Sequence, residues 1–341
     1  SVLSSNYSFY GDISNRIMNI LKKNLPIVEV YSIDEAFFTL DLKNKSDSFC
    51  HKLAKKILKW TGIPVSIGLA KTKTLAKIAN RVVKKKSQYP DLKIDNHSIF
   101  ELRSKKLVDY VLQRTNVHDI WGIGVKLAKF LMDSGVNNAF DLREFNESFA
   151  RKKRGVVLQR SILELKGVIC NEVEKESAKK KSICVSRSFG VKINAYEDIR
   201  SALIVYVQKA SSKMRDYNLF CKSISIFLKT SNYQEKKYKN TKTYSFLEGT
   251  NDVRVIWNIS EKLLKVIYLS DFVYSKVGVV LSDFCDYENI QKSLFHDRNQ
   301  GYYQKKSDSI KLMKTMDNIN KKFGDSKLRL SSDENGSFYL K

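Results

Sequence analysis

Two adjacent carboxylates, Asp34 and Glu35, stand inside a segment that otherwise consists mainly of apolar and β-branched residues. Strand-forming residues occupy positions 28–33 before the pair and 36–42 after it. Ionised side chains are seldom left among apolar neighbours unless they are paired or bind a cation. Carboxylate oxygens are hard ligands that suit Mg²⁺. The pair therefore predicts a magnesium site at a β-sheet.

The two side chains can share one ion only if the chain bends between them. Successive side chains of a strand point to opposite faces, so a straight strand would separate Asp34 from Glu35. A hairpin tip or a bulge would supply the bend. The alternative is a solvated turn that binds no metal, but no Gly, Pro or Asn marks an ordinary turn between the two apolar runs.

Length and charge narrow the class of protein. A chain of 341 residues predicts two or three domains. Sixty-one Lys and Arg against 36 Asp and Glu give a net charge of +25, which indicates a polyanionic partner, and nucleic acid above all. No apolar run approaches the ~20 residues of a membrane-spanning helix, and no signal segment opens the chain. We therefore expect a cytoplasmic protein with no membrane partner.

Cysteine and histidine usage argues against zinc enzymes and hydrolases. The five cysteines and four histidines are scattered without zinc-ligand spacing, and no Gly-x-Ser-x-Gly elbow occurs.

The first 170 residues predict two kinds of structure. Helical spacing is expected at residues 12–25, 48–60 and 75–86, and strands at 28–42 and 64–69. The first 95 residues or so are therefore α/β, with antiparallel pairing expected. From about 98 to 170 the pattern is helical, which predicts a small all-α module.

A charged, weakly apolar segment at 171–181 indicates a linker to a second α/β unit. In that unit we expect strands at 182–190, 221–230 and 274–281 and helices at 196–215 and 253–268. Residues 286–341 form a polar tail, with a helix expected around 309–321.

A Gly-x-Gly turn at Gly122 and Gly124 opens a helix that carries Lys126. Backbone N–H groups at such a turn, together with the helix dipole, suit a phosphate that is bound without reading the base. The pattern resembles a helix-hairpin-helix, and the alternative is a tight helix–helix turn that binds nothing.

A run of lysines follows the strand at 64–69: Lys71, Lys73, Lys77, Lys84, Lys85 and Lys86. A solvated helix face is the ordinary explanation of such a run. A nucleotide triphosphate near Asp34 and Glu35 would require cations in this place. The segment is not a P-loop, since its second glycine is missing.

The tail holds a short polar-then-apolar tag with Gln291, Leu294 and Phe295. Tags of this kind dock into grooves of partner proteins, although a stray apolar pair in a tail is the alternative.

Four motifs in order, YSIDEAF (31–37), GLAKTKTLAKIAN (68–80), IWGIG (120–124) and SRSFG (186–190), closely resemble the Y-family translesion DNA polymerases, specifically the bacterial UmuC branch. The similarity covers essentially the full chain and weakens after about residue 285.

The resemblance implies a multidomain α/β (α+β) polymerase architecture. It assigns 1–97 to the palm, 98–170 to an all-α thumb with a helix-hairpin-helix, and 171–183 to a linker. It further assigns 184–285 to an α/β little finger that grips duplex DNA, and 286–341 to a tail with a clamp-binding tag.

The resemblance also implies roles for residues. Asp34 and Glu35 match the catalytic carboxylates that bind two Mg²⁺ ions, and Lys84 matches a triphosphate-contacting lysine. The implied DNA contacts are Lys71, Lys73, Gly122, Gly124, Lys126 and Arg187. Gln291, Leu294 and Phe295 match a sliding-clamp tag.

The implied partners are primer-template DNA, dNTPs, a sliding clamp, a UmuD-type accessory dimer and a recombinase filament, in a bacterial, nucleoid-associated setting.

One departure from the family pattern affects the expected activity. UmuC-like chains open with a strand that bears a further metal-binding Asp and, just after it, an aromatic gate against ribonucleotides, and nothing in this sequence matches that segment. We therefore expect error-prone translesion synthesis in the SOS response from the intact protein, and weak or no activity from this chain alone. A non-catalytic DNA- and clamp-binding module and a metal-dependent nuclease are the alternatives.

Overall fold

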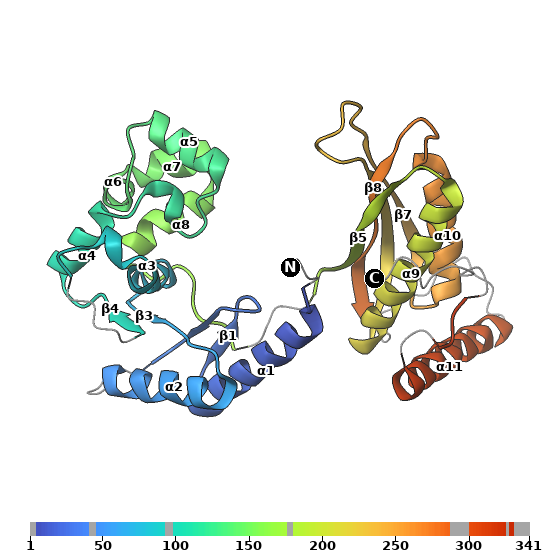
Figure 1. Ribbon diagram of the computed structural model, residues 1–341, viewed down its shortest axis with the longest axis horizontal. Coiled ribbons are helices and arrows are strands. Elements are labelled where there is room, and N and C mark those ends of the chain that lie inside the picture. Colours follow the sequence, from blue (N-terminus) through green and yellow to red (C-terminus); the bar gives the residue numbers. More distant parts are fainter. Residues whose placement is uncertain are drawn as a thin grey trace. The chain divides into compact units, whose positions relative to one another are not determined.

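The computed structural model describes residues 5–40, 46–92, 98–175, 180–286, 300–324 and 327–330. The chain divides into two compact units, residues 1–178 (unit 1) and 179–341 (unit 2), and each is described by itself (Figure 1). The division falls inside the segment that the sequence assigns to a linker. None of the described helices is long and apolar enough to cross a membrane.

The first part of unit 1 combines helices with two small sheets. The hairpin β1 (Val28–Val30) and β2 (Ala36–Phe38) is antiparallel, whereas β3 (Ile67–Leu69) pairs in parallel with β4 (Ile99–Glu101). The helices are α1 (Tyr7–Asn24), α2 (Ser46–Thr61), α3 (Lys73–Lys84) and the 3-10 turn η1 (Lys86–Gln88). Strand β4 lies in the range expected to be helical, because its three residues are too few to show a strand period in sequence.

Strand β3 and helix α3 approach each other unusually closely at Gly68. A Cβ atom there would lie 2.3 Å from the carbonyl oxygen of Ala76 and 2.3 Å from the backbone nitrogen of Asn80, so only glycine fits. Thr72 caps α3 by accepting a hydrogen bond from the Leu75 N–H at 3.3 Å. Helix α3 therefore begins directly at the end of β3 and is fixed against it.

The remainder of unit 1 is helical: η2 (Val117–Asp119), α4 (Lys105–Gln113), α5 (Val125–Asp133), α6 (Ala139–Glu144), α7 (Glu147–Arg154) and α8 (Val156–Leu165). These helices pack around fully buried leucines such as Leu112, Leu131 and Leu158. Leu75 and Ile78 of α3 belong to the same apolar cluster. Helix α3 is thus shared between the β-containing part of unit 1 and the helical module.

Glu164, near the end of α8, is a fully buried carboxylate. Its Oε2 accepts hydrogen bonds from the backbone N–H (3.0 Å) and the hydroxyl (2.6 Å) of Thr74, at the start of α3. Its Oε1 accepts from the backbone N–H (3.0 Å) and the side-chain amide (2.9 Å) of Asn171. A buried charge is tolerated when hydrogen bonds and a helix N-terminus stabilise it. Glu164 therefore joins α8, α3 and the segment that leads out of the helical module.

Glu29 on β1 makes a similar junction. Its Oε2 accepts from Lys73 Nζ at 2.6 Å and from the backbone N–H of Glu174 at 2.8 Å. Residues 171–174 are therefore held by two carboxylates of unit 1.

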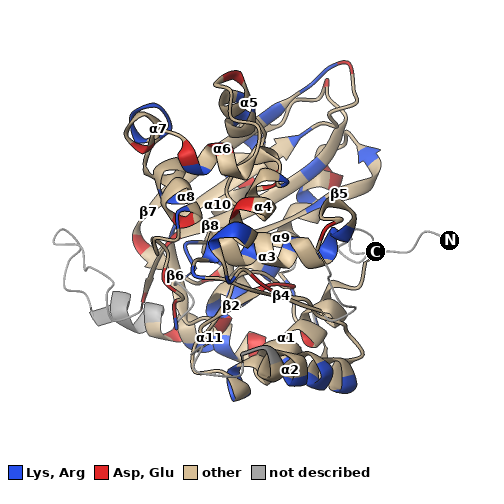
Figure 2. Cartoon of the chain, turned by 90° about the vertical axis from the view of Figure 1, so that its left-hand side faces the viewer, with Lys and Arg blue, Asp and Glu red and all other residues tan. Residues whose placement is uncertain are grey.

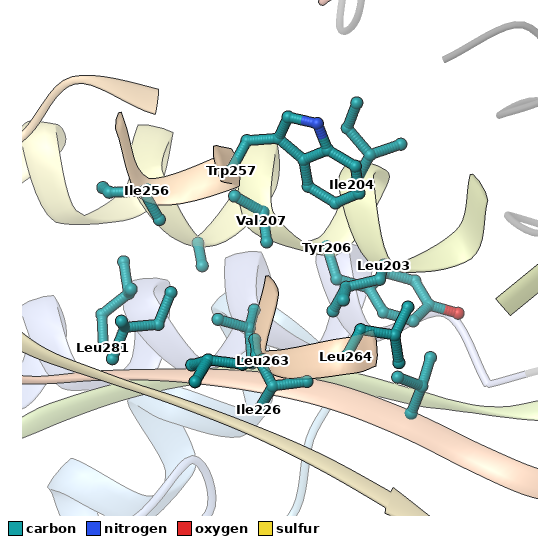
Figure 3. Close-up of a cluster of buried hydrophobic side chains, with 14 of the residues drawn as sticks. Leu203, Ile204, Tyr206, Val207, Ile226, Ile256, Trp257, Leu263, Leu264 and Leu281 are labelled. Atoms are coloured by element: carbon teal, nitrogen blue, oxygen red, sulfur yellow. The ribbon is translucent and has the colours of Figure 1, made fainter. Parts of the chain in front are cut away.

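Unit 2 is a four-stranded antiparallel sheet of order β5-β8-β6-β7, covered on one face by helices α9 (Tyr196–Asp216) and α10 (Val253–Ile267) (Figure 1). The strands are β5 (Ser182–Ile193), β6 (Leu219–Lys229), β7 (Lys239–Thr250) and β8 (Tyr274–Asp286). Figure 3 shows the core between sheet and helices, where Leu203, Ile226, Leu264 and Leu281 meet.

Two features of unit 2 differ from the sequence-based expectation. Strand β7 was not predicted, because it is an edge strand whose residues 239–245 are exposed and mostly polar, so it lacks an apolar period. Helix α11 (Gln300–Phe323) is longer than expected. It packs on the core through Met313, and Arg215 of α9 binds both carboxylate oxygens of Asp317 at 2.6 and 2.8 Å.

The buried Glu164 junction yields a stability prediction. Glu164→Ala leaves the N–H groups of Thr74 and Asn171 without acceptors, which we expect to lower the free energy of unfolding by about 3 kcal/mol. Urea denaturation measures this loss. Glu172→Ala, which removes an exposed carboxylate eight residues away, is the matched control and should change stability by less than about 0.5 kcal/mol. Equal effects of the two substitutions would contradict the role given to Glu164.

Candidate functional site

The hairpin tip that the sequence required is present between β1 and β2. The backbone N–H groups of Tyr31 and Ser32 both donate to the carbonyl oxygen of Glu35, each at 3.0 Å. These bonds fold residues 31–35 into a tight turn that carries Asp34 and Glu35.

Both carboxylates of the turn have partners that favour the ionised form. Ser32 Oγ donates to Asp34 Oδ1 at 2.5 Å, and this hydrogen bond is the largest reason why the pKa of Asp34 is lowered. The positive charges of Lys84 and Lys77 also lower that pKa. Glu35 Oε2 lies 2.7 Å from Lys77 Nζ. The turn thus offers hard anionic oxygens with α3 lysines close to them.

Asp34 and Glu35 border a cavity of about 680 Å³. Lys77 and Lys84 line the same cavity from α3, so the two carboxylates lie close to lysines. Most of the other walls are apolar and come from α1, the hairpin and β3, including Met18, Ile33, Phe37, Val65 and Ile67.

Two strand edges meet at this cavity. Residues of β2 and of β3 both line it, and within the described residues β2 pairs only with β1 and β3 only with β4. The cavity is therefore a groove between two unpaired edges, with the carboxylate turn at its rim.

The donor set suits Mg²⁺ in kind but is small. Carboxylates and a negatively charged phosphate are the ligands that Mg²⁺ prefers. In the part of the chain that the structure describes, no cluster of three or more Asp, Glu, His or Cys side chains is available to a metal. Asp34 and Glu35 are a two-carboxylate set.

The predicted lysines have different environments. Lys84 is exposed at the end of α3, and its positive charge acts on the carboxylate of Asp34. Lys71 is exposed beside Gly167. Lys73 is buried and paired with Glu29, so its expected role as a DNA contact is not supported by its position.

Lys77 was in the lysine run but was not among the predicted site residues. The spacing contained a signal for it, because Lys77 and Lys84 are seven residues apart and so share one face of a helix. The partner of Lys77, Glu35, is 42 residues away, and no local pattern indicates that pairing.

An aromatic bridge, which sequence reasoning missed, joins the carboxylate turn to the Gly-x-Gly turn. Trp121 Nε1 donates to the Tyr31 hydroxyl at 3.0 Å. The centre of the Trp121 ring also lies 5.7 Å from that of Tyr31 and 5.5 Å from that of Phe37. The ring centres of Tyr31 and Phe37 are 5.6 Å apart. Since Trp121 directly precedes Gly122, this cluster holds the two turns together.

The Gly-x-Gly turn has the backbone that a phosphate-binding turn requires. Gly122 has φ +86°, which favours glycine, and Gly124 is the N-cap of α5 without a side-chain hydrogen bond to the helix. Lys126 is exposed in the first turn of that helix. A Cβ on Gly122 would lie 3.9 Å from Ser161 Oγ of α8.

In unit 2, the sheet face opposite α9 and α10 carries a row of three lysines. Lys229 of β6 is the direct cross-strand partner of both Lys239 of β7 and Lys276 of β8, and Ser188 of β5 continues the row. Gly278, two residues from Lys276, packs against Phe227 and Ser186 on this face. We call Lys229, Lys239 and Lys276 the lysine row.

The rest of this face is rich in hydroxyl groups. At its other end Ser182, Ser282, Ser223 and Ser245 are aligned across all four strands. No lysine of the row pairs with a carboxylate among the described residues. Like charges directly opposite each other destabilise a sheet, so the row is a site where an anion would be bound favourably.

Arg187 lies on the opposite side from the lysine row. It pairs in register with the buried Val277. Burial raises the pKa of Tyr206 on α9, and the charge of Arg187 acts to lower it, which places Arg187 toward the helix-covered side. Gln291, Leu294 and Phe295 lie outside the described residues.

Comparisons with known proteins agree on one family. The model of the impB/mucB/samB family matches residues 1–81, and the model of the impB/mucB/samB family C-terminal domain matches residues 180–294. Protein UmuC of Salmonella typhimurium is 38% identical, with 94% of this chain and 75% of the relative covered. Protein MucB of Escherichia coli is 32% identical, with 94% and 74% covered.

More distant similarity extends to DNA polymerase IV of Clostridium kluyveri, at 27% identity over 97% of this chain and 80% of that protein. Among solved structures, a Y-family DNA polymerase chimera matches with a TM-score of 0.62 at 24% identity, covering 82% of this chain and 77% of the other. This structural match shows a shared fold.

The aromatic bridge yields a double-mutant prediction. Tyr31→Phe and Trp121→Phe each remove one partner of the 3.0 Å hydrogen bond and keep a ring, and we expect each to cost about 0.5–1 kcal/mol of stability. Because the two changes remove the same bond, the double variant should lose less than the sum of the two. Urea denaturation of the four proteins measures the coupling, and Tyr7→Phe, at an exposed tyrosine of the same unit, is the control. Additive losses would contradict the bridge.

Proposed function

Because this chain belongs to the impB/mucB/samB family, the UmuC branch of the Y-family DNA polymerases, we propose that it acts on primer-template DNA through the carboxylate turn of unit 1. By family it is a DNA-directed DNA polymerase of translesion synthesis. The observation that carries the assignment of the site is that Asp34 and Glu35, on one turn, border the same groove as Lys77 and Lys84, with Glu35 paired to Lys77.

In the proposed site, Asp34 and Glu35 would hold Mg²⁺. When bound, Mg²⁺ lowers the pKa of an attacking 3′-hydroxyl and neutralises charge on the triphosphate. The resemblance implies two such ions.

The protein side chains orient and neutralise the reactants. Ser32 keeps the Asp34 carboxylate ionised, and Lys77 fixes Glu35 by an ion pair. Lys84, which is exposed and acts electrostatically on Asp34, would contact the triphosphate of an incoming dNTP.

Two carboxylates would hold a metal pair weakly, so we propose low polymerase activity for the 341-residue chain itself. The resemblance implies a further strand with a third carboxylate. The groove between β2 and β3 has two unpaired edges and apolar walls, which are the features that would receive such a strand.

Duplex DNA is the proposed macromolecular partner of both units. In unit 1 the Gly122 and Gly124 turn, with Lys126, would bind a backbone phosphate. In unit 2 the lysine row supports phosphate binding better than Arg187, which lies on the other side of the sheet. The chain's net charge of +25 supplies the long-range attraction.

The finer partners rest on the resemblance. A sliding clamp would bind the tag with Gln291, Leu294 and Phe295, and a UmuD-type dimer and a recombinase filament would assist synthesis in the bacterial cytoplasm, near the nucleoid.

Primer extension past an abasic site tests the catalytic assignment. With the full-length protein, Mg²⁺ and four dNTPs, we expect extension that Asp34→Ala lowers by at least about a hundredfold, because a metal ligand is lost. Asp12→Ala, at an exposed carboxylate of α1, is the control and should retain activity.

Other outcomes of the same assay identify the alternatives. Salt-dependent DNA binding without incorporation, unchanged by Asp34→Ala, would show a non-catalytic DNA- and clamp-binding module. Degradation of labelled DNA would show a nuclease.

Replacement of all three residues of the lysine row by alanine gives a second prediction, with two effects of opposite sign. Affinity for duplex DNA should fall, and the slope of log K against log salt should decrease by about 2–3, because each lost phosphate contact removes about 0.9. Thermal stability at low salt should rise, because like charges opposite each other are removed. Alanines at Lys213, Lys262 and Lys265, exposed on α9 and α10, are the control with the same change of charge. A variant that binds DNA as tightly as the parent would contradict the assignment.

A further inference from the structure

The last turn of helix α7 carries four exposed cations in succession. Its four residues are Arg151, Lys152, Lys153 and Arg154, and all four are exposed. We call them the α7 cluster, and Figure 2 shows it as a blue turn of the ribbon. Among the described residues, none of the four is paired with a carboxylate.

Stabilisation of the helix does not account for the α7 cluster. One or two cations near a helix C-terminus interact favourably with the dipole, by about 0.3–1 kcal/mol each. Four like charges in one turn also repel one another, since Arg151 and Arg154 are neighbours at spacing i, i+3. An external anion would relieve this repulsion.

The α7 cluster is held close to the Gly-x-Gly turn. The guanidinium of Arg154 lies 4.0 Å from the ring centre of Phe130, on helix α5, whose N-cap is Gly124. Along α8, which begins directly after Gly155, Ser161 lies beside Gly122. Ser161 is six residues after Gly155, which corresponds to a rise of about 9 Å along the helix axis.

Phosphates recur at every base-pair step, and three steps advance about 10 Å along the DNA axis. A duplex bound at the Gly122 turn therefore presents further phosphates to a neighbouring group of cations. The exposed ring of Phe149 beside the cluster already contacts one of its cations, because Lys153 Nζ lies 5.9 Å from the ring centre, so the cluster suits a sugar–phosphate backbone rather than stacked bases.

We propose that the α7 cluster is a second DNA-backbone contact of unit 1, separate from the Gly-x-Gly turn. This inference rests on the proposed function, in which unit 1 binds duplex DNA at Gly122 and Gly124. The contact is independent of base sequence, and it extends the grip of unit 1 to phosphates several base pairs away.

The test compares two triple variants of the 341-residue chain that lose the same charge. The first is Arg151→Ala, Lys152→Ala and Lys153→Ala, which leaves the contact between Arg154 and Phe130 intact. The second, Lys52→Ala, Lys55→Ala and Lys59→Ala, removes three exposed lysines from α2 in the same unit. Alanine is a good helix former, so both variants should melt like the parent, which circular dichroism checks.

Fluorescence anisotropy with a labelled duplex, between 50 and 300 mM KCl, measures affinity and its salt dependence. We expect the α7 variant to weaken binding about tenfold or more at 0.1 M KCl, and to lower the slope of log K against log salt by about 2. The α2 variant should bind within about threefold of the parent.

The possible results separate this inference from the proposed function. An unchanged slope in the α7 variant, or equal losses in both variants, would overturn the inference, the latter by showing that only net charge matters. Failure of the parent chain to bind the duplex at all would overturn the proposed function.

Discussion

The position of helix α3 is the constraint on which the rest of unit 1 depends. Gly68 lets the helix lie directly against β3, and the buried Glu164 holds its first turn. From this fixed helix, Lys73 reaches Glu29 and Lys77 reaches Glu35, so strand β1 and the carboxylate turn are both connected to it. Arg81, near its other end, forms an ion pair with Asp119, just before the Gly-x-Gly turn. One helix thereby positions the carboxylate turn and the Gly-x-Gly turn together.

The same helix shows how cations are divided between structure and binding. Lys73 and Lys77 are at least partly buried and satisfied by carboxylates of the unit itself, whereas Lys84 is exposed. The lysine row and the α7 cluster are, by contrast, groups of like charges without carboxylates to balance them among the described residues. A protein with a net charge of +25 is most stable when a polyanion covers such groups.

The sequence predicted most elements, since their apolar periods are strong. The amphipathic α1, α2 and α3 and the core-forming strands β6 and β8 were found within a few residues of their true ends. Strands β4 and β7 were missed because the first is three residues long and the second is an exposed edge with a polar sequence. Both segments are strands because they pair with a neighbouring strand, and their own sequences show no strand pattern.

The site was predictable only as far as local chemistry determines it. The adjacency of Asp34 and Glu35 indicated a bend and a cation, and the hairpin is present. The pairs that define the surroundings of the turn connect distant parts of the chain: Lys77 with Glu35, Trp121 with Tyr31 and Glu164 with Thr74. The lysine row depends on the register of three strands, one of which could not be recognised in the sequence. Such contacts follow from packing, which a linear pattern does not encode.

The hydrogen bonds of Asn171 and Glu174 with unit 1 also determine how far unit 2 can travel. Because residues up to Glu174 are held in unit 1 and β5 begins at Ser182, only eight Cα–Cα steps connect the two units. Such a tether spans at most about 28 Å. If both units bind one duplex, as proposed, the second contact would form at the high effective concentration that a short tether gives.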